Sequence, residues 1–176
     1  PAYNNLGLML LEERKLDESE RALLKAIALA PDYPDARDSL GLVAQRRGLF
    51  EEAARHHRAA IERDGAFVEA HHNLGTALCA LGLLDEGIES FSRALALAPG
   101  SFGILISLAN ALGDKGAHKE ALPHYEEALR IDPNRAPAWV SYGIALHETG
   151  EIDKAITQYD RALELREDFA EAQRNR

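Results

Sequence analysis

Residues 68–99 read VEAHHNLGTALCALGLLDEGIESFSRALALAP, and their pattern recurs along the chain every 34 residues. The Leu-Gly pair of this stretch, Leu74-Gly75, has counterparts at Leu6-Gly7, Leu40-Gly41, Leu108-Ala109 and Tyr142-Gly143. Its alanine near the end, Ala94, belongs to the series Ala26, Ala60, Ala94, Ala128 and Ala162. A fixed period of this length indicates stacked supersecondary units.

Each repeat contains two stretches with apolar residues three and four apart, such as Pro34–Arg47 and Glu51–Arg63, and this spacing predicts two amphipathic helices. The composition agrees, because 30 Ala, 26 Leu, 20 Lys plus Arg and 18 Glu far outnumber 15 Val, Ile and Thr together. Glycine recurs between the two stretches at Gly48, Gly82, Gly116 and Gly150, with Arg14 in its place in the first copy. Glycine ends helices readily, so we predict a helical hairpin in each repeat.

A single hairpin cannot bury both sides of its apolar stripe, so consecutive hairpins stack. We therefore expect an all-α, right-handed superhelical solenoid with a concave face, spanning residues 1–176 as one domain. Its five repeats are residues 1–33, 34–67, 68–101, 102–135 and 136–169, and residues 170–176 begin a sixth unit or form a capping helix. Because Pro1 enters a helix directly and no cap precedes it, we interpret the chain as a fragment of a longer protein.

These residues resemble the tetratricopeptide repeat family. The family signature has an aromatic residue at position 4, Leu-Gly at 7 and 8, Ala at 20, an aromatic at 24, Ala at 27 and Pro at 32, and Leu6-Gly7 fill positions 7 and 8 here. Departures occur at Arg37 and His71 at position 4 and at His57 at position 24. Pro123, near the start of a second helix, predicts a modest local distortion.

Composition narrows the function classes. The net charge of −9 and a pI near 5.3 argue against a nucleic-acid partner. The apolar runs fall short of the roughly 20 residues that a membrane span needs. Cytoplasmic location is then the default expectation. The one cysteine, Cys79, excludes an internal disulfide, and we expect it to be a small apolar residue facing the groove rather than a nucleophile.

No cofactor, metal or catalytic site is predicted. His56-His57 and His71-His72 invite a metal hypothesis, but no Cys or well-placed carboxylate completes the ligands of a zinc site. We expect His57 and His71 to be buried and hydrogen-bonded instead. The sequence carries no phosphate loop, hydrolase elbow or dinucleotide fingerprint, so we expect no enzymatic activity.

The candidate binding residues lie on one stripe of each first helix. Position 6 carries an uncharged polar series: Asn5, Ser39, Asn73, Ser107 and Ser141. Position 9 carries Leu8, Leu42, Thr76, Asn110 and Ile144, and position 5 adds His72, Ile106 and Val140. Asn and Ser can both donate to and accept from the backbone of an extended peptide, and the apolar residues beside them offer shallow pockets.

The polar series resembles in part the asparagine ladder in the array of O-linked N-acetylglucosamine transferases, which holds peptide backbone. Asn5 and Asn73 match that ladder by residue type. The carboxylate clamp of chaperone-binding arrays is absent from this sequence. We therefore predict a non-catalytic scaffold that binds a protein or peptide in its groove. The alternatives are the partner-selecting arm of a larger enzyme, such as a glycosyltransferase, and a homo-oligomer that assembles through terminal helices.

Overall fold

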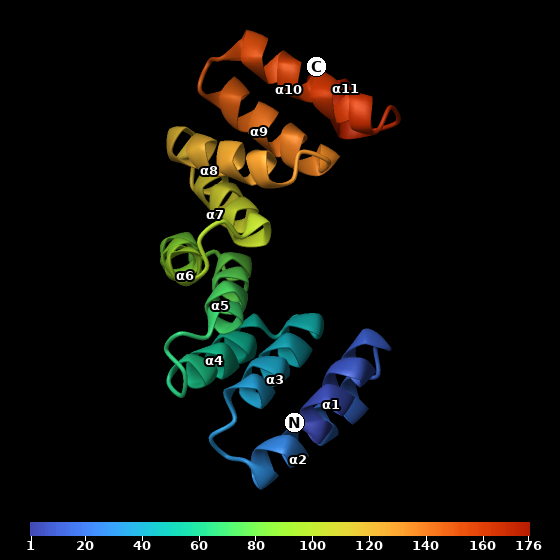
Figure 1. Cartoon of the computed structure of the whole chain (residues 1–176), viewed down its shortest axis with the longest axis vertical. Helices are drawn as coiled ribbons and strands as arrows, with labels where there is room; N and C mark the ends of the chain where they lie inside the picture. Colours follow the sequence, from blue (N-terminus) through green and yellow to red (C-terminus); the bar gives the residue numbers. More distant parts are fainter. The chain divides into compact units, whose positions relative to one another are not determined.

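The computed structural model describes all residues, 1–176, and every element in it is a helix (Figure 1). In chain order the helices are α1 (Ala2–Glu12), α2 (Leu16–Leu29), α3 (Pro34–Arg46), α4 (Phe50–Ile61), α5 (Val68–Ala80), α6 (Leu84–Leu97), α7 (Phe102–Asp114), α8 (His118–Ile131), α9 (Ala136–Glu148), α10 (Ile152–Leu165) and α11 (Ala170–Asn175). The predicted all-α fold of five helical hairpins and a short terminal helix is confirmed.

The chain forms two compact bodies. The N-terminal body is Pro1–Leu97 with helices α1 to α6, and the C-terminal body is Ala98–Arg176 with helices α7 to α11. Within each body every helix packs against the next one in sequence, and alternate first helices also touch, as α3 touches α1 and α5. Each body is therefore a stack of hairpins in the predicted order.

The turn between the two helices of a hairpin depends on a left-handed residue. Gly48 has φ 77°, and the amide of Leu49 donates to the carbonyl of Ala44 at 2.9 Å. This bond satisfies one of the last helix carbonyls. In the first hairpin Arg14 takes the same conformation with φ 60°, and the amide of Lys15 donates to Leu10 at 2.9 Å. The turn geometry thus persists where the glycine is missing.

The two helices of a hairpin meet closely at position 8. A Cβ added to Gly75 would lie 2.7 Å from the ring of Phe91, and one on Gly41 would lie 2.3 Å from the imidazole of His57. Only a residue without a side chain allows these rings to lie against the first helix. The glycines of the Leu-Gly motif therefore set the distance between the helices of a hairpin.

In four of the units, the side chain at position 4 donates a hydrogen bond to the end of the preceding repeat. The acceptor is the main-chain oxygen six residues earlier. The four bonds are Arg37 Nη2 to Pro31 at 3.0 Å, His71 Nε2 to Gly65 at 3.0 Å, Trp139 Nε1 to Pro133 at 2.8 Å and Gln173 Nε2 to Glu167 at 2.9 Å. Arg37 and His71 thus keep the hydrogen bond that the indole of Trp139 makes.

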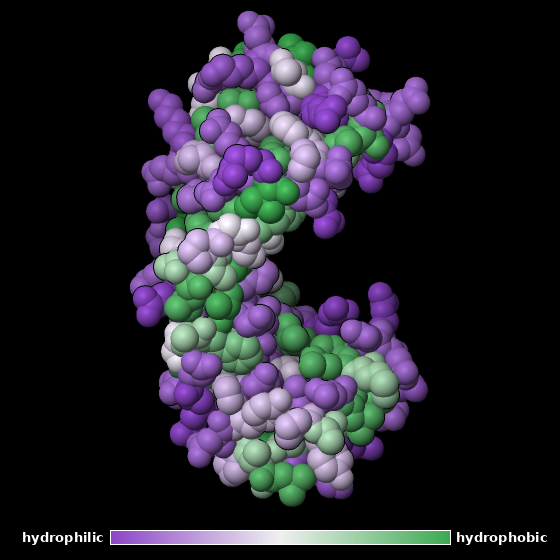
Figure 2. Space-filling model, in the orientation of Figure 1, coloured by the Kyte–Doolittle hydropathy of each residue, from purple (hydrophilic) through white to green (hydrophobic).

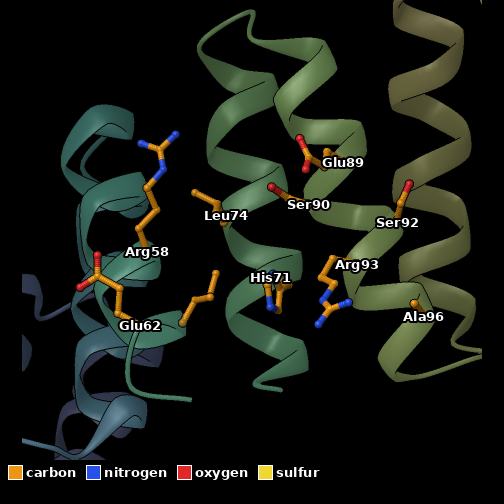
Figure 3. A pocket seen from close by; sticks show the side chains of 10 residues that line it. Arg58, Glu62, His71, Leu74, Glu89, Ser90, Ser92, Arg93 and Ala96 are labelled. Carbon is orange, nitrogen blue, oxygen red and sulfur yellow. The ribbon is translucent and has the colours of Figure 1, made fainter. Parts of the chain in front are cut away.

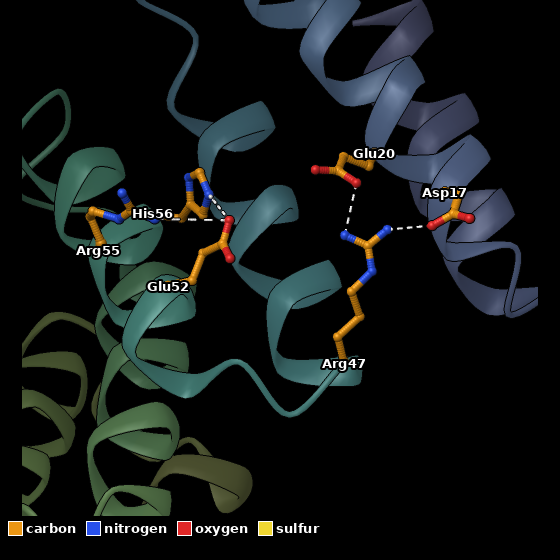
Figure 4. Close-up of polar contacts among 6 residues, drawn as sticks. All are labelled: Asp17, Glu20, Arg47, Glu52, Arg55 and His56. Carbon is orange, nitrogen blue, oxygen red and sulfur yellow. Dashed lines mark hydrogen bonds and ion pairs between the residues drawn. The ribbon is translucent and has the colours of Figure 1, made fainter.

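Ion pairs link neighbouring hairpins at the surface (Figure 4). Arg47, which follows α3, reaches α2 and pairs with Asp17 at 2.6 Å and Glu20 at 2.8 Å.

Pro123 lies inside α8, which runs without a break from His118 to Ile131. The expected distortion therefore does not interrupt this helix.

Candidate functional site

The predicted groove residues of the N-terminal body differ in how far solvent reaches them. Asn5 and Thr76 are exposed, whereas Leu8, Leu42, His72 and Asn73 are half-buried. Ser39 is only 4% exposed. Little of the Ser39 side chain is therefore presented to solvent, compared with Asn5 and Asn73 at the same position of the repeat.

A buried polar network lies directly behind this stretch. His57 Nδ1 lies 2.6 Å from Asp38 Oδ1, and Asp38 Oδ2 accepts a hydrogen bond from Asn73 Nδ2 at 2.9 Å. His57 is 0% exposed, and its Nε2 has no partner. One carboxylate thus joins α3, α4 and α5, which come from two successive repeats.

Some of the hydrogen-bonding groups of Asn73 are therefore used within the fold. Its side-chain amide donates to Asp38, and its main-chain oxygen accepts a bond from Gln45 Nε2 at 3.0 Å. Both bonds connect α5 to α3. The side-chain oxygen and the second amide hydrogen of Asn73 are not used in these two bonds.

His72 is an uncharged aromatic side chain of this part of the groove near neutral pH. Its ring lies 5.4 Å from that of Phe91, centroid to centroid. Burial lowers the pKa of His72 below its ordinary value of 6.5, and the negative charges of Asp38 and Glu69 only partly oppose this. The neighbouring Thr76 donates its hydroxyl hydrogen to the main-chain oxygen of His72 at 3.1 Å.

In the C-terminal body three predicted residues gather around one hollow of about 340 Å³. Asn110 from α7 is exposed, and Ser141 and Ile144 from α9 are half-buried. Ile106 and Ser107, also predicted, lie half-buried on α7 but do not line this hollow. The structure thus brings position 9 of α7 together with positions 6 and 9 of α9.

Tyr125 from α8 adds a hydroxyl to the hollow. It donates to Asn110 Oδ1 at 2.7 Å, and this bond does not use the amide hydrogens of Asn110. Burial raises the pKa of Tyr125 far above its ordinary value, and the charge of Asp114 adds to this. The phenol therefore stays protonated and keeps donating at any physiological pH.

A second hollow of about 430 Å³ lies beside the first in α9, α10 and α11. Ile144 lines both, and the second hollow adds Tyr159, Glu148 and Asn175. Asn175 occupies position 6 of the sixth repeat, so it extends the polar series to the last helix. The groove face of this body, defined as Asn110, Ser141, Ile144 and Asn175, therefore lines two neighbouring hollows.

Family models described as tetratricopeptide repeat match residues 1–33, 67–134 and 114–174. The chain belongs to the tetratricopeptide repeat family. The solved structure of YrrB, a tetratricopeptide protein, is similar, with a TM-score of 0.83, 22% identity and coverage of 98% of this chain and 89% of that one. Also similar are MamA (TM-score 0.84, 26% identity, 93% and 96% coverage) and pilF from Pseudomonas aeruginosa (TM-score 0.85, 22% identity, 93% and 75% coverage). No curated protein matches the chain.

Tetratricopeptide repeats build protein–protein interaction scaffolds, and this general role applies to the chain. The family signature explains why sequence reasoning missed Tyr125: an aromatic at position 24 is assigned to the packing between helices. The ring is indeed buried, but its hydroxyl reaches the groove face. The sequence signal for this hydroxyl is that position 24 of the fourth repeat carries a tyrosine rather than a phenylalanine.

His57, His71 and Cys79 contact other parts of the fold. His57 and His71 are buried and hydrogen-bonded, as predicted. Cys79, expected to face the groove, instead points toward α6, because a Cβ on Gly87 would lie 2.5 Å from its Sγ. No three His, Cys, Asp or Glu side chains come together as metal ligands. The helices are all too short or too polar to cross a bilayer.

Proposed function

We propose that the chain binds an extended segment of a partner protein along the groove face of its first helices, and that it does so without catalysis. The observation that carries this proposal is the grouping of Asn110, Ser141 and Ile144 around one hollow next to Tyr125. These residues supply donors, acceptors and an apolar surface within a single short stretch.

The chemistry of this stretch favours a peptide backbone over a charged ligand. Asn110 offers amide hydrogens to a backbone carbonyl, because its oxygen is already bonded to Tyr125. Ser141 offers a hydroxyl that can accept from the next peptide group, while the same hydroxyl lies within hydrogen-bond range of Tyr125. Ile144, shared by both hollows, offers an apolar contact for one side chain.

The similar fold of YrrB supports the proposal in a general way. YrrB is a tetratricopeptide protein with an unusual peptide-binding site. Peptide binding is therefore compatible with a helical stack of this kind, and the residues that perform it here have to be those of this chain.

The test uses peptides selected from a displayed random library on the intact chain. Titration of a selected peptide should show binding that falls by about tenfold or more in the variant Asn110→Ala with Ser141→Ala, since two hydrogen bonds are lost. Asn134→Ala is the matched control, because Asn134 is exposed and lies outside the groove face. Equal binding by both variants and the wild type would refute the groove.

Self-association remains a second candidate, and an apolar surface on α1 favours it. Leu6 and Met9 are 39% and 53% exposed, whereas their counterparts one repeat later, Leu40 and Val43, are 5% and 1% exposed. Apolar side chains are visible along α1 in Figure 2. A face of this kind packs against a further hairpin, from the same chain or from a second copy.

Light scattering over a range of concentrations tests this candidate. The apparent mass should rise with concentration, and Leu6→Ser with Met9→Ser should abolish the rise. Leu83→Ser, which changes an exposed leucine outside this face, serves as the control. A constant monomer mass at all concentrations excludes self-association.

A further inference from the structure

One position on the groove side of the first helices has no side chain in the fourth repeat. In the other four repeats position 12 carries Leu11, Gln45, Cys79 or His147. The fourth repeat has Gly113 there, and this glycine lines the hollow of about 340 Å³ that Asn110 and Ser141 also line. A Cβ added to Gly113 would meet one atom, Nδ1 of His118, at 3.9 Å. The hollow therefore has room for a side chain at this point.

The second repeat shows which kind of side chain belongs in this place. Gln45 is the counterpart of Gly113, and Asn73 is the counterpart of Ser141. Gln45 Nε2 donates to the main-chain oxygen of Asn73 at 3.0 Å and so joins two successive first helices. The main-chain oxygen of Ser141 holds the equivalent place in the C-terminal body, but Gly113 has no donor to offer it. A donor from a ligand can replace the missing amide.

The other polar groups of the hollow also favour a donor. Tyr125 donates its hydroxyl hydrogen to Asn110 Oδ1 at 2.7 Å, and the hydroxyl of Ser141 lies within hydrogen-bond range of Tyr125. The two hydroxyls thus interact with groups of the protein itself. The carboxylate of Asp114, which can only accept, lines the same hollow. A side chain that enters here finds acceptors at Ser141 and Asp114.

Asp114 determines which charge the hollow favours. Its counterpart in the second repeat is Arg46, so the charge next to position 12 is reversed in the fourth repeat. Asp114 is exposed and forms no ion pair, and its charge helps to raise the pKa of Tyr125, which shows that it lies near the hollow. The lining contains neither Lys nor Arg. An unpaired carboxylate at such a site favours a cationic side chain over a neutral amide.

A larger hollow in the N-terminal body has no such preference (Figure 3). It has a volume of about 790 Å³ and is lined by residues of α4, α5 and α6. Its lining contains Arg58 and Arg93 as well as Glu62 and Glu89. Because the two signs of charge are equally represented, these charges do not favour one class of ligand.

We propose that the hollow at Gly113 binds the side chain of a lysine or arginine from the segment that lies along the groove face. The cationic nitrogen donates to the main-chain oxygen of Ser141, as Gln45 Nε2 does to that of Asn73, and its charge pairs with Asp114. The proposal rests on the groove proposed above and adds the class of side chain that the groove selects.

The probe is a peptide selected from the displayed random library on the intact wild-type chain. The selected peptides should share a lysine or arginine at one position. Replacement of this residue by norleucine, which keeps an aliphatic stem without the charge, should weaken binding by about tenfold in fluorescence anisotropy.

Asp114→Asn tests the charge. It should weaken binding of the basic peptide by about threefold and change that of the norleucine peptide by less than about twofold. Asp153→Asn is the matched control, because it makes the same change in charge at an exposed position that does not line the hollow. This control should change neither affinity by more than about twofold.

Gly113→Gln tests the place of the side chain, because its amide can reach Ser141 as Gln45 reaches Asn73. It should weaken binding of the basic peptide by about tenfold or more, whereas Gly113→Ala, which is too short to reach, should change it by less than about twofold. With a peptide that carries Ala in place of the basic residue, Gly113→Gln should have little further effect, since both changes remove the same contact. Gln forms helix more readily than Gly, so a melting temperature no lower than that of the wild type verifies that this variant is folded.

The proposal is overturned if the selected peptides share no basic residue, if the norleucine peptide binds as well as the basic one, if Gly113→Gln binds as the wild type does, or if Asp114→Asn and Asp153→Asn have equal effects. Where one of these results accompanies lost binding in Asn110→Ala with Ser141→Ala, the groove stands and only the assignment of this hollow fails. If that double variant binds every selected peptide as the wild type does, both proposals fail.

Discussion

His57 and Asp38 form a buried pair, with 2.6 Å between Nδ1 and Oδ1, at two positions that the three following repeats fill with apolar or aromatic residues. The repeats that follow carry Phe91, Tyr125 and Tyr159 in place of His57, and His72, Ile106 and Val140 in place of Asp38. The second repeat has therefore exchanged an apolar contact for a hydrogen-bonded one. Each of these two buried polar side chains needs the other as a hydrogen-bond partner.

We predict that His57→Phe alone destabilises the chain, although it restores the aromatic residue of the other repeats. Asp38 would stay buried and would keep only the bond from Asn73. Loss of one partner of a buried pair typically costs about 3 kcal/mol. Urea unfolding followed by circular dichroism measures this change.

The double variant Asp38→Val with His57→Phe provides the control. It resembles the fifth repeat, where Val140 and Tyr159 hold these positions, so it should recover most of the stability lost in His57→Phe. If the double variant is as unstable as the sum of the two single changes, the two residues are not coupled.

How far the sequence predicts this molecule depends on the scale. The period of the Leu-Gly motif is sufficient to place all five hairpins, because a fixed spacing reflects a repeated packing contact. The same pattern does not predict whether a polar side chain is free to bind a ligand. Ser39 and Asn73 occupy the same repeat position, but the first is buried and the second is bonded to Asp38 on another helix. Such partners depend on neighbouring helices that the pattern of one helix does not contain.

The donors at position 4 lead to a prediction about Trp139. Its indole nitrogen donates to the main-chain oxygen of Pro133 at 2.8 Å, and Trp139→Phe removes this bond but keeps an aromatic ring. We expect a loss of about 1 kcal/mol in the free energy of unfolding, measured in urea. Tyr3→Phe in the first repeat is the control and should cost almost nothing, since that side chain stacks under Lys25 through its ring. Equal losses in the two variants would show that the bond is unimportant.

Arg14 offers a stabilising substitution. It holds the left-handed conformation with φ 60° at the turn where the other hairpins have glycine. For a residue with a Cβ, this conformation costs about 1 kcal/mol or more in the folded state. Glycine avoids that cost, but it also increases the conformational entropy of the unfolded chain, which offsets part of the stabilisation. Arg14→Gly should therefore raise the stability by about 0.5 kcal/mol. Gly48→Ala, the reverse change one repeat later, should lower it by about 1 kcal/mol; the opposite signs are the result to look for in thermal melting.

Two other glycines should respond to alanine in opposite directions. At Gly75 the new methyl group would lie 2.7 Å from the ring of Phe91, so the two helices would have to separate, at a cost of about 2 kcal/mol. Gly103 lies in α7 with open space around it, and Gly103→Ala should stabilise the chain by up to about 0.5 kcal/mol through helix propensity. Chemical unfolding distinguishes the two, and a neutral Gly75→Ala would mean that the hairpin adjusts without strain.

Three half-buried histidines make stability depend on pH. Burial lowers the pKa of His56, His72 and His124 below the ordinary value of 6.5. As the pH falls through 6.5 the unfolded chain therefore takes up protons on these rings before the folded chain does. Their contribution is fully present above that pH and decreases below it. We expect a lower free energy of unfolding at about pH 5.5 than at about pH 7.5. The variant with all three changed to Gln should show a smaller difference between the two conditions, measured by urea unfolding at each pH; an equal or larger difference would place the dependence on other groups.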